Sequence, residues 1–156
     1  MRYLLFLIFL SACTSSSSSK EEKYDVPALN STELTSLLKK ACEEGKKKES
    51  PLLIEFSAPW CGDCKKLNTL KKEKILADAL STWPMVRVNI GKFDQHKDLL
   101  KAFKINAIAN WVVVDTKTCD QPVAHWPIQH QRILEPMSGE KLSPHSLAQW
   151  LQESRK

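Results

Sequence analysis

Hydrophobic residues in the first third of the chain follow two different spacings. In "NSTELTSLLKKAC", Asn30 is a candidate N-cap with Glu33 three residues later, as in a capping box. Apolar residues then recur at helical spacing, namely Leu34, Leu37, Leu38 and Ala41, and Gly45 is expected to end this helix. "PLLIEFSA" is instead a short, nearly continuous apolar run, which is typical of a buried central strand.

The remaining elements alternate in the same way. After "PWCGDC" the pattern predicts a helix that extends to Leu80, then a strand in "MVRVNI" and a short helix in "HKDLLKAF". "WVVVD" predicts a strand, "TKTCDQP" a turn-rich break, and Ser143-Pro144 the start of a closing helix. One further strand is expected before that helix. This order predicts an α/β layered domain without internal repeats.

The N-terminus has the pattern of a targeting segment. Leu4 to Leu10 is an unbroken apolar run, too short to span a bilayer, and "LSAC" follows it. That ending resembles the lipobox of bacterial lipoproteins, in which the cysteine, here Cys13, is lipidated. The alternative is an ordinary signal peptide with an incidental cysteine. We therefore expect a lipoprotein signal peptide over residues 1–12, a serine-rich flexible tether over 13–27, and a folded domain over 28–156.

Composition narrows the choice of partners. The 156 residues carry a net charge of +5, with 26% charged and 42% hydrophobic residues, which are values of a globular protein. Lysines alternate with glutamates, as in "ACEEGKKKES", and this is typical of a solvated face. Without a nucleic-acid-binding motif, no nucleic-acid partner is expected.

Four cysteines remain after Cys13, and they carry the candidate chemistry. An exported chain meets an oxidising compartment, where four cysteines allow three pairings. The spacing favours Cys61 with Cys64, directly after a strand and at the start of a helix. The helix N-terminus stabilises a thiolate and so lowers the pKa of Cys61. Cys64 could then attack the first sulfur and resolve a mixed disulfide. The alternatives are a purely structural bridge, or a metal site with His96 or His125.

The segment "FSAPWCGDCKKL" resembles the active-site segment of thioredoxins, W-C-G-P-C-K. The resemblance covers roughly residues 30–151, and "VNIGKFDQHKDL" looks especially like bacterial envelope thioredoxin-like proteins. It implies a thioredoxin-like fold, with a mixed sheet of four to five strands flanked by helices. It also implies a monomeric thiol–disulfide oxidoreductase without a cofactor, acting on cysteine pairs of envelope proteins and served by an upstream redox partner.

The resemblance assigns further roles. Glu55 matches a buried acid that would accept the proton of Cys64, although it could instead be a carboxylate paired with a lysine. Trp60, Ile108 and Ala109 would bind the substrate chain, although Trp60 could instead belong to the core. The alternative functions are a non-catalytic thioredoxin-fold binding module and a lipoprotein that handles a soft metal.

Two positions depart from the family pattern. Asp63 replaces the proline between the cysteines, and its charge disfavours a thiolate at Cys61. Lys65 and the helix dipole favour a thiolate there. Together with Gly62, Asp63 and Lys65 are the residues expected to tune the redox properties of the pair. Ala109 stands where thioredoxins have a cis-proline. A cis bond before a residue other than proline costs about 2.5–4 kcal/mol, so we predict that the Ile108–Ala109 bond is trans. Looser substrate binding and easier capture of soft metals would follow.

The other two cysteines could form a structural bridge. In the thioredoxin arrangement the strand "WVVVD" runs antiparallel to "LLIEF", so its end lies near the start of the central strand. Cys119 follows that end, and Cys42 lies in the helix that leads into the central strand. A Cys42–Cys119 disulfide requires Cα atoms within roughly 7 Å.

Overall fold

The computed structural model describes residues 24–134 and 142–155. Its elements are α1 (Ser31–Lys47), β1 (Leu52–Ser57), α2 (Gly62–Leu70), α3 (Lys74–Leu80), β2 (Met85–Asn89), α4 (Lys97–Ala102), β3 (Asn110–Val114), β4 (Ile128–Ile133) and α5 (Pro144–Glu153), with 3-10 turns η1 (Thr116–Thr118) and η2 (Val123–His125). The predicted signal peptide, Cys13 and most of the predicted tether lie outside the described residues. No helix within the described ranges is long and apolar enough to cross a bilayer.

The strands form one mixed sheet in the order β2-β1-β3-β4. β1 runs parallel to β2 and antiparallel to β3, and β3 runs antiparallel to β4. Every residue of β1 and β3 is buried, whereas the edge strand β4 is largely exposed, and this explains why the two central strands have continuous apolar sequences. The structure confirms the predicted thioredoxin-like α/β fold.

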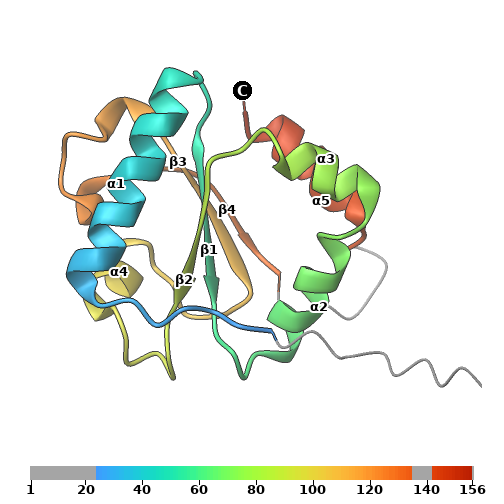
Figure 1. Ribbon diagram of the computed structural model, residues 1–156, viewed down its shortest axis with the longest axis horizontal. Coiled ribbons are helices and arrows are strands. Elements are labelled where there is room, and N and C mark those ends of the chain that lie inside the picture. The colour runs from blue at the N-terminus through green and yellow to red at the C-terminus, as the bar shows by residue number, and fades with distance from the viewer. Residues whose placement is uncertain (1–23, 135–141, 156) are drawn as a thin grey trace, which may run out of the picture.

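Helices cover both faces of the sheet. Figure 1 shows α1 and α4 on one face, and α2, α3 and α5 on the other. The loops that follow β1 and β2 lie together at the lower end of this view, where α2 begins. The sheet therefore brings the CxxC segment, which follows β1, next to the loop between β2 and α4.

Two predicted helix boundaries are wrong. The single helix expected after the CxxC segment is two helices, because the chain turns at residues 71–73, where Lys71 directs its ammonium group inward to Glu55. Gly45 does not end α1, which continues to Lys47. Gly45 is buried inside the helix instead, and a Cβ there would lie 2.6 Å from the Ser50 carbonyl oxygen and 2.7 Å from the Thr116 methyl. Close packing, and not helix termination, requires this glycine.

A disulfide ties α1 to the turn after β3. Cys42 and Cys119 are joined with their Cα atoms 5.7 Å apart, and both side chains are buried. The separation satisfies the geometric condition set from the sequence. This bond links the helix that precedes the central strand to the end of its antiparallel neighbour.

The folded domain begins before the predicted boundary at residue 28. Val26 is buried, and its carbonyl accepts a hydrogen bond from the Asn89 side chain at 2.7 Å. The hydroxyl groups of Tyr24 and Ser57 also form a hydrogen bond. The last residues of the predicted tether thus pack on β1 and β2, because Tyr24 and Val26 supply apolar surface that the serine-rich part lacks.

Candidate active site

Cys61 and Cys64 lie where the central strand passes into α2. They form a disulfide, and Cys61 is the N-cap of α2, its sulfur accepting the backbone N–H of Cys64 at 3.0 Å. Cys61 keeps 4% of its surface exposed and Cys64 only 1%. The helix start therefore presents the Cys61 sulfur outward and holds Cys64 behind it, between α2 and the sheet.

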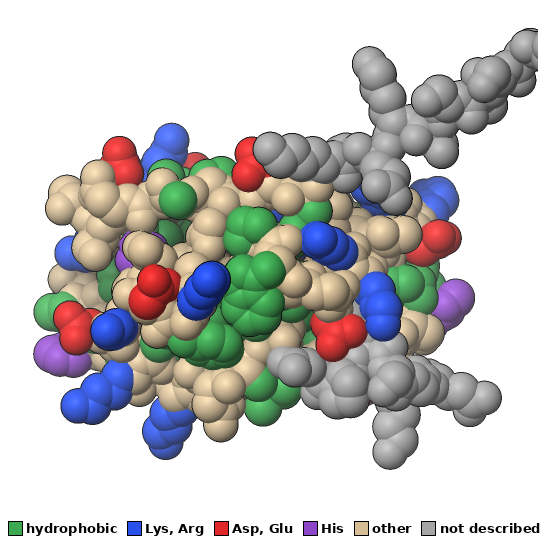
Figure 2. All heavy atoms as spheres, turned by 90° about the horizontal axis from the view of Figure 1, so that it is seen from below, with side chains coloured by type: hydrophobic (Ala, Val, Ile, Leu, Met, Phe, Trp, Pro, Cys, Tyr) green, Lys and Arg blue, Asp and Glu red, His purple; other side chains and the backbone are tan. Residues whose placement is uncertain are grey.

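A cavity of about 220 Å³ opens beside Cys61, and we call it the cysteine pocket. The first residues of α2 and three loops line it, with Trp60, Cys61, Gly62, Asp63, Phe93, Asn106, Ala107 and Ile108. Cys64 does not line it. Figure 2 views this end of the molecule and shows hydrophobic side chains gathered near the middle of the face, with charged side chains around them. A sulfur entering the pocket would meet Cys61 first.

Trp60 is a surface residue, so its interpretation as core packing is wrong. Its side chain is 52% exposed, and its ring lies 6.4 Å from that of Phe93, centroid to centroid. The indole N–H donates a 2.7 Å hydrogen bond to the Gly91 carbonyl. The bond holds the ring against the loop between β2 and α4, so that both aromatic rings flank the pocket.

The loop opposite the cysteines corrects another prediction. The Ile108–Ala109 peptide bond is cis, not trans. The prediction weighed only the local preference of the bond, whereas Ala109 is fully buried and its carbonyl accepts the N–H of Leu134 at 2.8 Å. Tertiary contacts therefore fix the backbone of this turn without a proline. Ile108 lines the pocket, but Ala109 does not.

The proposed tuning residues have unequal positions. Asp63 lines the pocket, and its carboxylate is 3.5 Å from the ammonium group of Lys66, not of Lys65. Lys65 points to solvent as an exposed residue of α2. Gly62 has open space around its Cα, so packing does not demand a glycine there. The local charge near Cys61 is thus set by Asp63 with Lys66 and by the start of α2.

Glu55 is the centre of a buried polar cluster under α2. It is only 1% exposed, and its neighbours in the sheet register are Arg87 on β2 and Trp111 on β3. The carboxylate accepts two bonds from the Lys71 ammonium at 2.8 and 3.0 Å, one from Arg87 at 2.7 Å and one from the Trp111 indole at 2.9 Å. Glu55 is therefore both buried and paired with a lysine, and the sequence had offered these as alternatives.

This hydrogen bonding restricts how Glu55 can handle protons. Both carboxylate oxygens already accept two bonds each, so a proton from Cys64 could bind only if one donor moved. Among the three donors, the Lys71 ammonium is the group that can itself lose a proton. Burial lowers the pKa of its ammonium, and the charge of Glu55 opposes that shift. Glu55 and Lys71 together form an ion pair with two hydrogen bonds in this layer.

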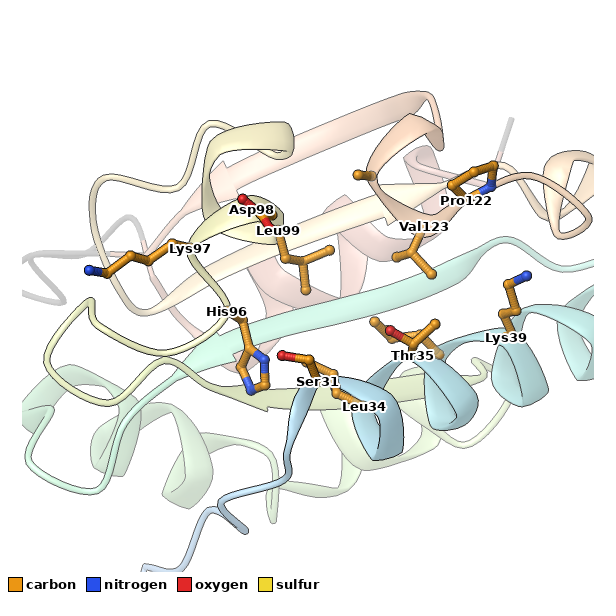
Figure 3. Close-up of a pocket in the computed structure, with 12 residues that line it drawn as sticks. Ser31, Leu34, Thr35, Lys39, His96, Lys97, Asp98, Leu99, Pro122 and Val123 are labelled. Carbon is orange, nitrogen blue, oxygen red and sulfur yellow. The ribbon is translucent and has the colours of Figure 1, made fainter.

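Another cavity lies away from the cysteines. It has a volume of about 500 Å³ between α1, α4 and η2, and Leu99 and Val123 point into it (Figure 3). His96 lines this cavity, and no cysteine does. Within residues 24–134 and 142–155, no three His, Cys, Asp or Glu side chains are placed to share a metal ion. The alternative of a metal site shared by the cysteines with His96 or His125 therefore gains no support.

Sequence reasoning missed part of the pocket wall. Phe93, Asn106 and Ala107 come from two loops, and only the sheet brings them to Cys61. Phe93 had a detectable signal, since it is an isolated aromatic residue in the polar stretch "GKFDQ". Asn106 and Ala107 carry no comparable signal, because small and polar residues are ordinary in loops.

Comparison with known proteins places the CxxC segment in a family context. The family model described as Thioredoxin matches residues 31–124. The chain is 36% identical over 78 residues to the protein disulfide-isomerase tigA of Aspergillus niger, covering 49% of this chain and 21% of that protein. It is 35% identical over 60 residues to the mitochondrial thioredoxin of Bos taurus, covering 38% and 34%. The chain thus spans about a fifth to a third of the length of these relatives.

Solved structures show the same architecture. A disulphide isomerase from Xylella fastidiosa Temecula1 superposes with a TM-score of 0.66 at 21% identity, over 85% of this chain and 98% of that one. The reduced C-terminal domain of DsbD from Neisseria meningitidis superposes with a TM-score of 0.59 at 18% identity, over 78% and 96%. At these identities the likeness shows the fold.

Proposed function

The chain belongs to the thioredoxin family, and from this premise we propose that it exchanges disulfides with cysteine pairs of other proteins through Cys61 and Cys64. One observation carries the proposal. Cys61 is the N-cap of α2 and lines an open pocket, while Cys64 lies behind it and already shares a disulfide with it. A structural bridge would not need a cavity at one of its sulfurs.

In the reducing direction, the Cys61 thiolate attacks one sulfur of a partner disulfide. The partner S–S bond breaks, a Cys61–partner disulfide forms, and the released thiolate takes a proton from water. Cys64 then loses its proton and attacks the Cys61 sulfur, which frees the second partner thiol and restores the Cys61–Cys64 disulfide. Two electrons have passed to the partner, and a dithiol protein upstream must supply them again. The reverse sequence oxidises a partner dithiol.

Glu55 and Lys71 take up the proton that Cys64 loses during resolution. The support is their place in the layer between α2 and the sheet, which is also where Cys64 is buried. Trp60 and Ile108 contact the partner chain, since both line the pocket. Ala109 positions that loop from beneath, because it is buried and does not line the cavity.

The cellular setting is a further part of the proposal. "LSAC" at residues 10–13 supports lipidation of Cys13, which would hold the domain on the bacterial cell envelope, on the outer membrane where the host has two. The partners would then be envelope proteins. Expression of the full chain with Cys13→Ala tests this, and unchanged membrane fractionation and unchanged mature mass would contradict it.

Reduction of insulin by dithiothreitol tests the catalytic proposal. The wild-type chain should accelerate precipitation of the insulin B chain, and Cys61→Ser should reduce the rate to the uncatalysed background. The matched control is the double variant Cys42→Ala/Cys119→Ala, which removes the other disulfide and should still catalyse the reaction below its melting temperature. If the wild-type protein is active in neither the reducing nor the oxidising direction, that result would favour a binding module instead.

A further inference from the structure

A second hollow adjoins the cysteine pocket. It measures about 480 Å³ and is lined by Phe93, Lys97, Leu100, Lys101, Lys104, Ile105 and Asn106. Phe93 and Asn106 line both cavities, so the two cavities adjoin between Cys61 and α4, and we call the pair the groove. We call the second part the lysine hollow.

We propose that this groove selects substrates in which an acidic, partly apolar segment lies next to the reactive cysteine. This inference rests on the proposed function and deepens it, because it names the class of peptide that the site prefers. The substrate sulfur would meet Cys61, an apolar side chain would lie on the Trp60 and Phe93 rings, and a carboxylate further along would reach the lysine hollow.

The aromatic part of the groove is held in place by its own loop. Phe93 is 37% exposed and has a left-handed backbone with φ of 63°. The turn around it is tied by the Trp60 indole on the Gly91 carbonyl and by the Asp94 carboxylate, which accepts the N–H of Lys92 at 2.8 Å. An aromatic side chain that stays exposed while its backbone is fixed is suited to contact a partner.

All charged residues that line the lysine hollow are positive. Lys97 and Lys101 are four residues apart on α4 and therefore share a helix face, and Lys104 follows the helix. All three are exposed, and none forms an ion pair with an acid among residues 24–134 and 142–155. Leu100 and Ile105, both buried, form the apolar floor between them. The hollow thus combines an apolar base with three available cations.

The lining of the other end of the groove contains an acid instead of lysines. Among the described residues that line the cysteine pocket, Asp63 alone is charged, and Lys66, whose ammonium group lies 3.5 Å from it, does not line the pocket. A substrate carboxylate would be repelled at that end and attracted at the lysine hollow. The charge pattern therefore predicts that acidic residues are favoured on one side of the substrate cysteine only.

Matched peptides test this selectivity. Each peptide contains one disulfide between two cysteines, and one glutamate is placed at successive positions before or after the attacked cysteine, with a glutamine version as its control. The fully reduced chain reacts with each peptide, and acid-quenched chromatography gives the rate at subsaturating peptide. At low salt the glutamate version should react roughly 3- to 10-fold faster on one side of the cysteine, as expected of a rim charge that steers association. At about 1 M salt the ratio should approach one, since the Debye length falls to about 3 Å.

Two charge-reversal variants identify the surface responsible. Lys101→Glu/Lys104→Glu should abolish or invert the glutamate-to-glutamine ratio. Lys39→Glu/Lys40→Glu makes the same charge change on exposed residues of α1 and should leave the ratio as in the wild type. Equal rates for both peptides in the wild type, or an equal loss in both variants, would overturn the inference while the proposed function stands. Absence of exchange with every peptide and with insulin would overturn both.

Discussion

The two disulfides of this domain have the same chemistry but differ in the length of the loop they close and in their surroundings. Cys61 and Cys64 are three positions apart and close a single turn, whereas Cys42 and Cys119 are 77 positions apart and close half of the chain. In the chain-entropy model the short loop stabilises the fold by about 2 kcal/mol and the long loop by about 4.5 kcal/mol. The domain can therefore open the first bond far more easily than the second.

The surroundings of the two bonds reinforce this difference. Cys61 borders a cavity formed by the start of α2 and three loops, so another sulfur can reach it. Cys42 and Cys119 are buried between α1 and the turn after β3. The position of each disulfide therefore suggests its role. A disulfide that closes a short loop beside a cavity is suited to exchange with a partner's sulfur, and one that closes a long loop in the core is suited to stabilise the fold.

The largest expected effect separates the proposed attack from the proposed resolution at the Cys61–Cys64 pair. Cys64→Ser keeps the attacking thiol but removes the resolving one, so a covalent complex with the substrate should accumulate, and turnover should fall by more than about 100-fold. Non-reducing electrophoresis and mass spectrometry of the trapped complex measure this. Accumulation of the complex in Cys61→Ser instead of Cys64→Ser would reverse the assigned roles.

The second prediction concerns the structural pair. Cys42→Ala/Cys119→Ala should lower the free energy of unfolding by about 4 kcal/mol and the melting temperature by roughly 10 °C, because the unfolded chain loses its long closed loop. Denaturant titration measures the change. Cys61→Ala/Cys64→Ala is the matched control, and it should lose about 2 kcal/mol or less. A larger loss in the control would refute the comparison.

The third prediction addresses the polar layer beneath the exchanging pair. Glu55→Gln leaves the buried Lys71 without its charge partner and should destabilise the fold by about 3 kcal/mol. If Glu55 and Lys71 also receive the proton of Cys64, resolution should slow most at low pH, where the Cys64 thiol is hardest to deprotonate. Stopped-flow kinetics across pH at a temperature where the variant is folded measure this. An unchanged pH profile would leave Glu55 with a structural role only.

The smallest effect should come from the indole that orders the pocket wall. Trp60→Phe keeps an aromatic ring but removes the N–H that binds the Gly91 carbonyl, at a cost of about 0.5–1 kcal/mol. We expect little change in melting temperature and faster amide hydrogen exchange at residues 91–95. Unchanged exchange in that loop would show that the hydrogen bond does not order it.

The sequence alone was enough to predict the elements with strong local patterns. The capping box at Asn30, the apolar runs of β1 and β3, and the Ser143-Pro144 start of α5 all appear where the pattern placed them. The CxxC segment after a strand also predicted that Cys61 starts the helix and that Cys64 is the more buried of the two cysteines. These features depend on residues close together in the chain, so composition and spacing are sufficient to specify them.

Only the tertiary structure decided the features that depend on contacts between distant segments. The cis bond before Ala109, the inward turn of Lys71 and the use of Gly45 for packing all run against the local preference of the sequence. Phe93 and Asn106 reach Cys61 only because parallel β1 and β2 end at the same edge of the sheet. Local preferences amount to a few kcal/mol, and the burial and hydrogen bonds of a packed core can outweigh them. The sequence therefore located the CxxC cysteines, and the fold built the pocket beside Cys61.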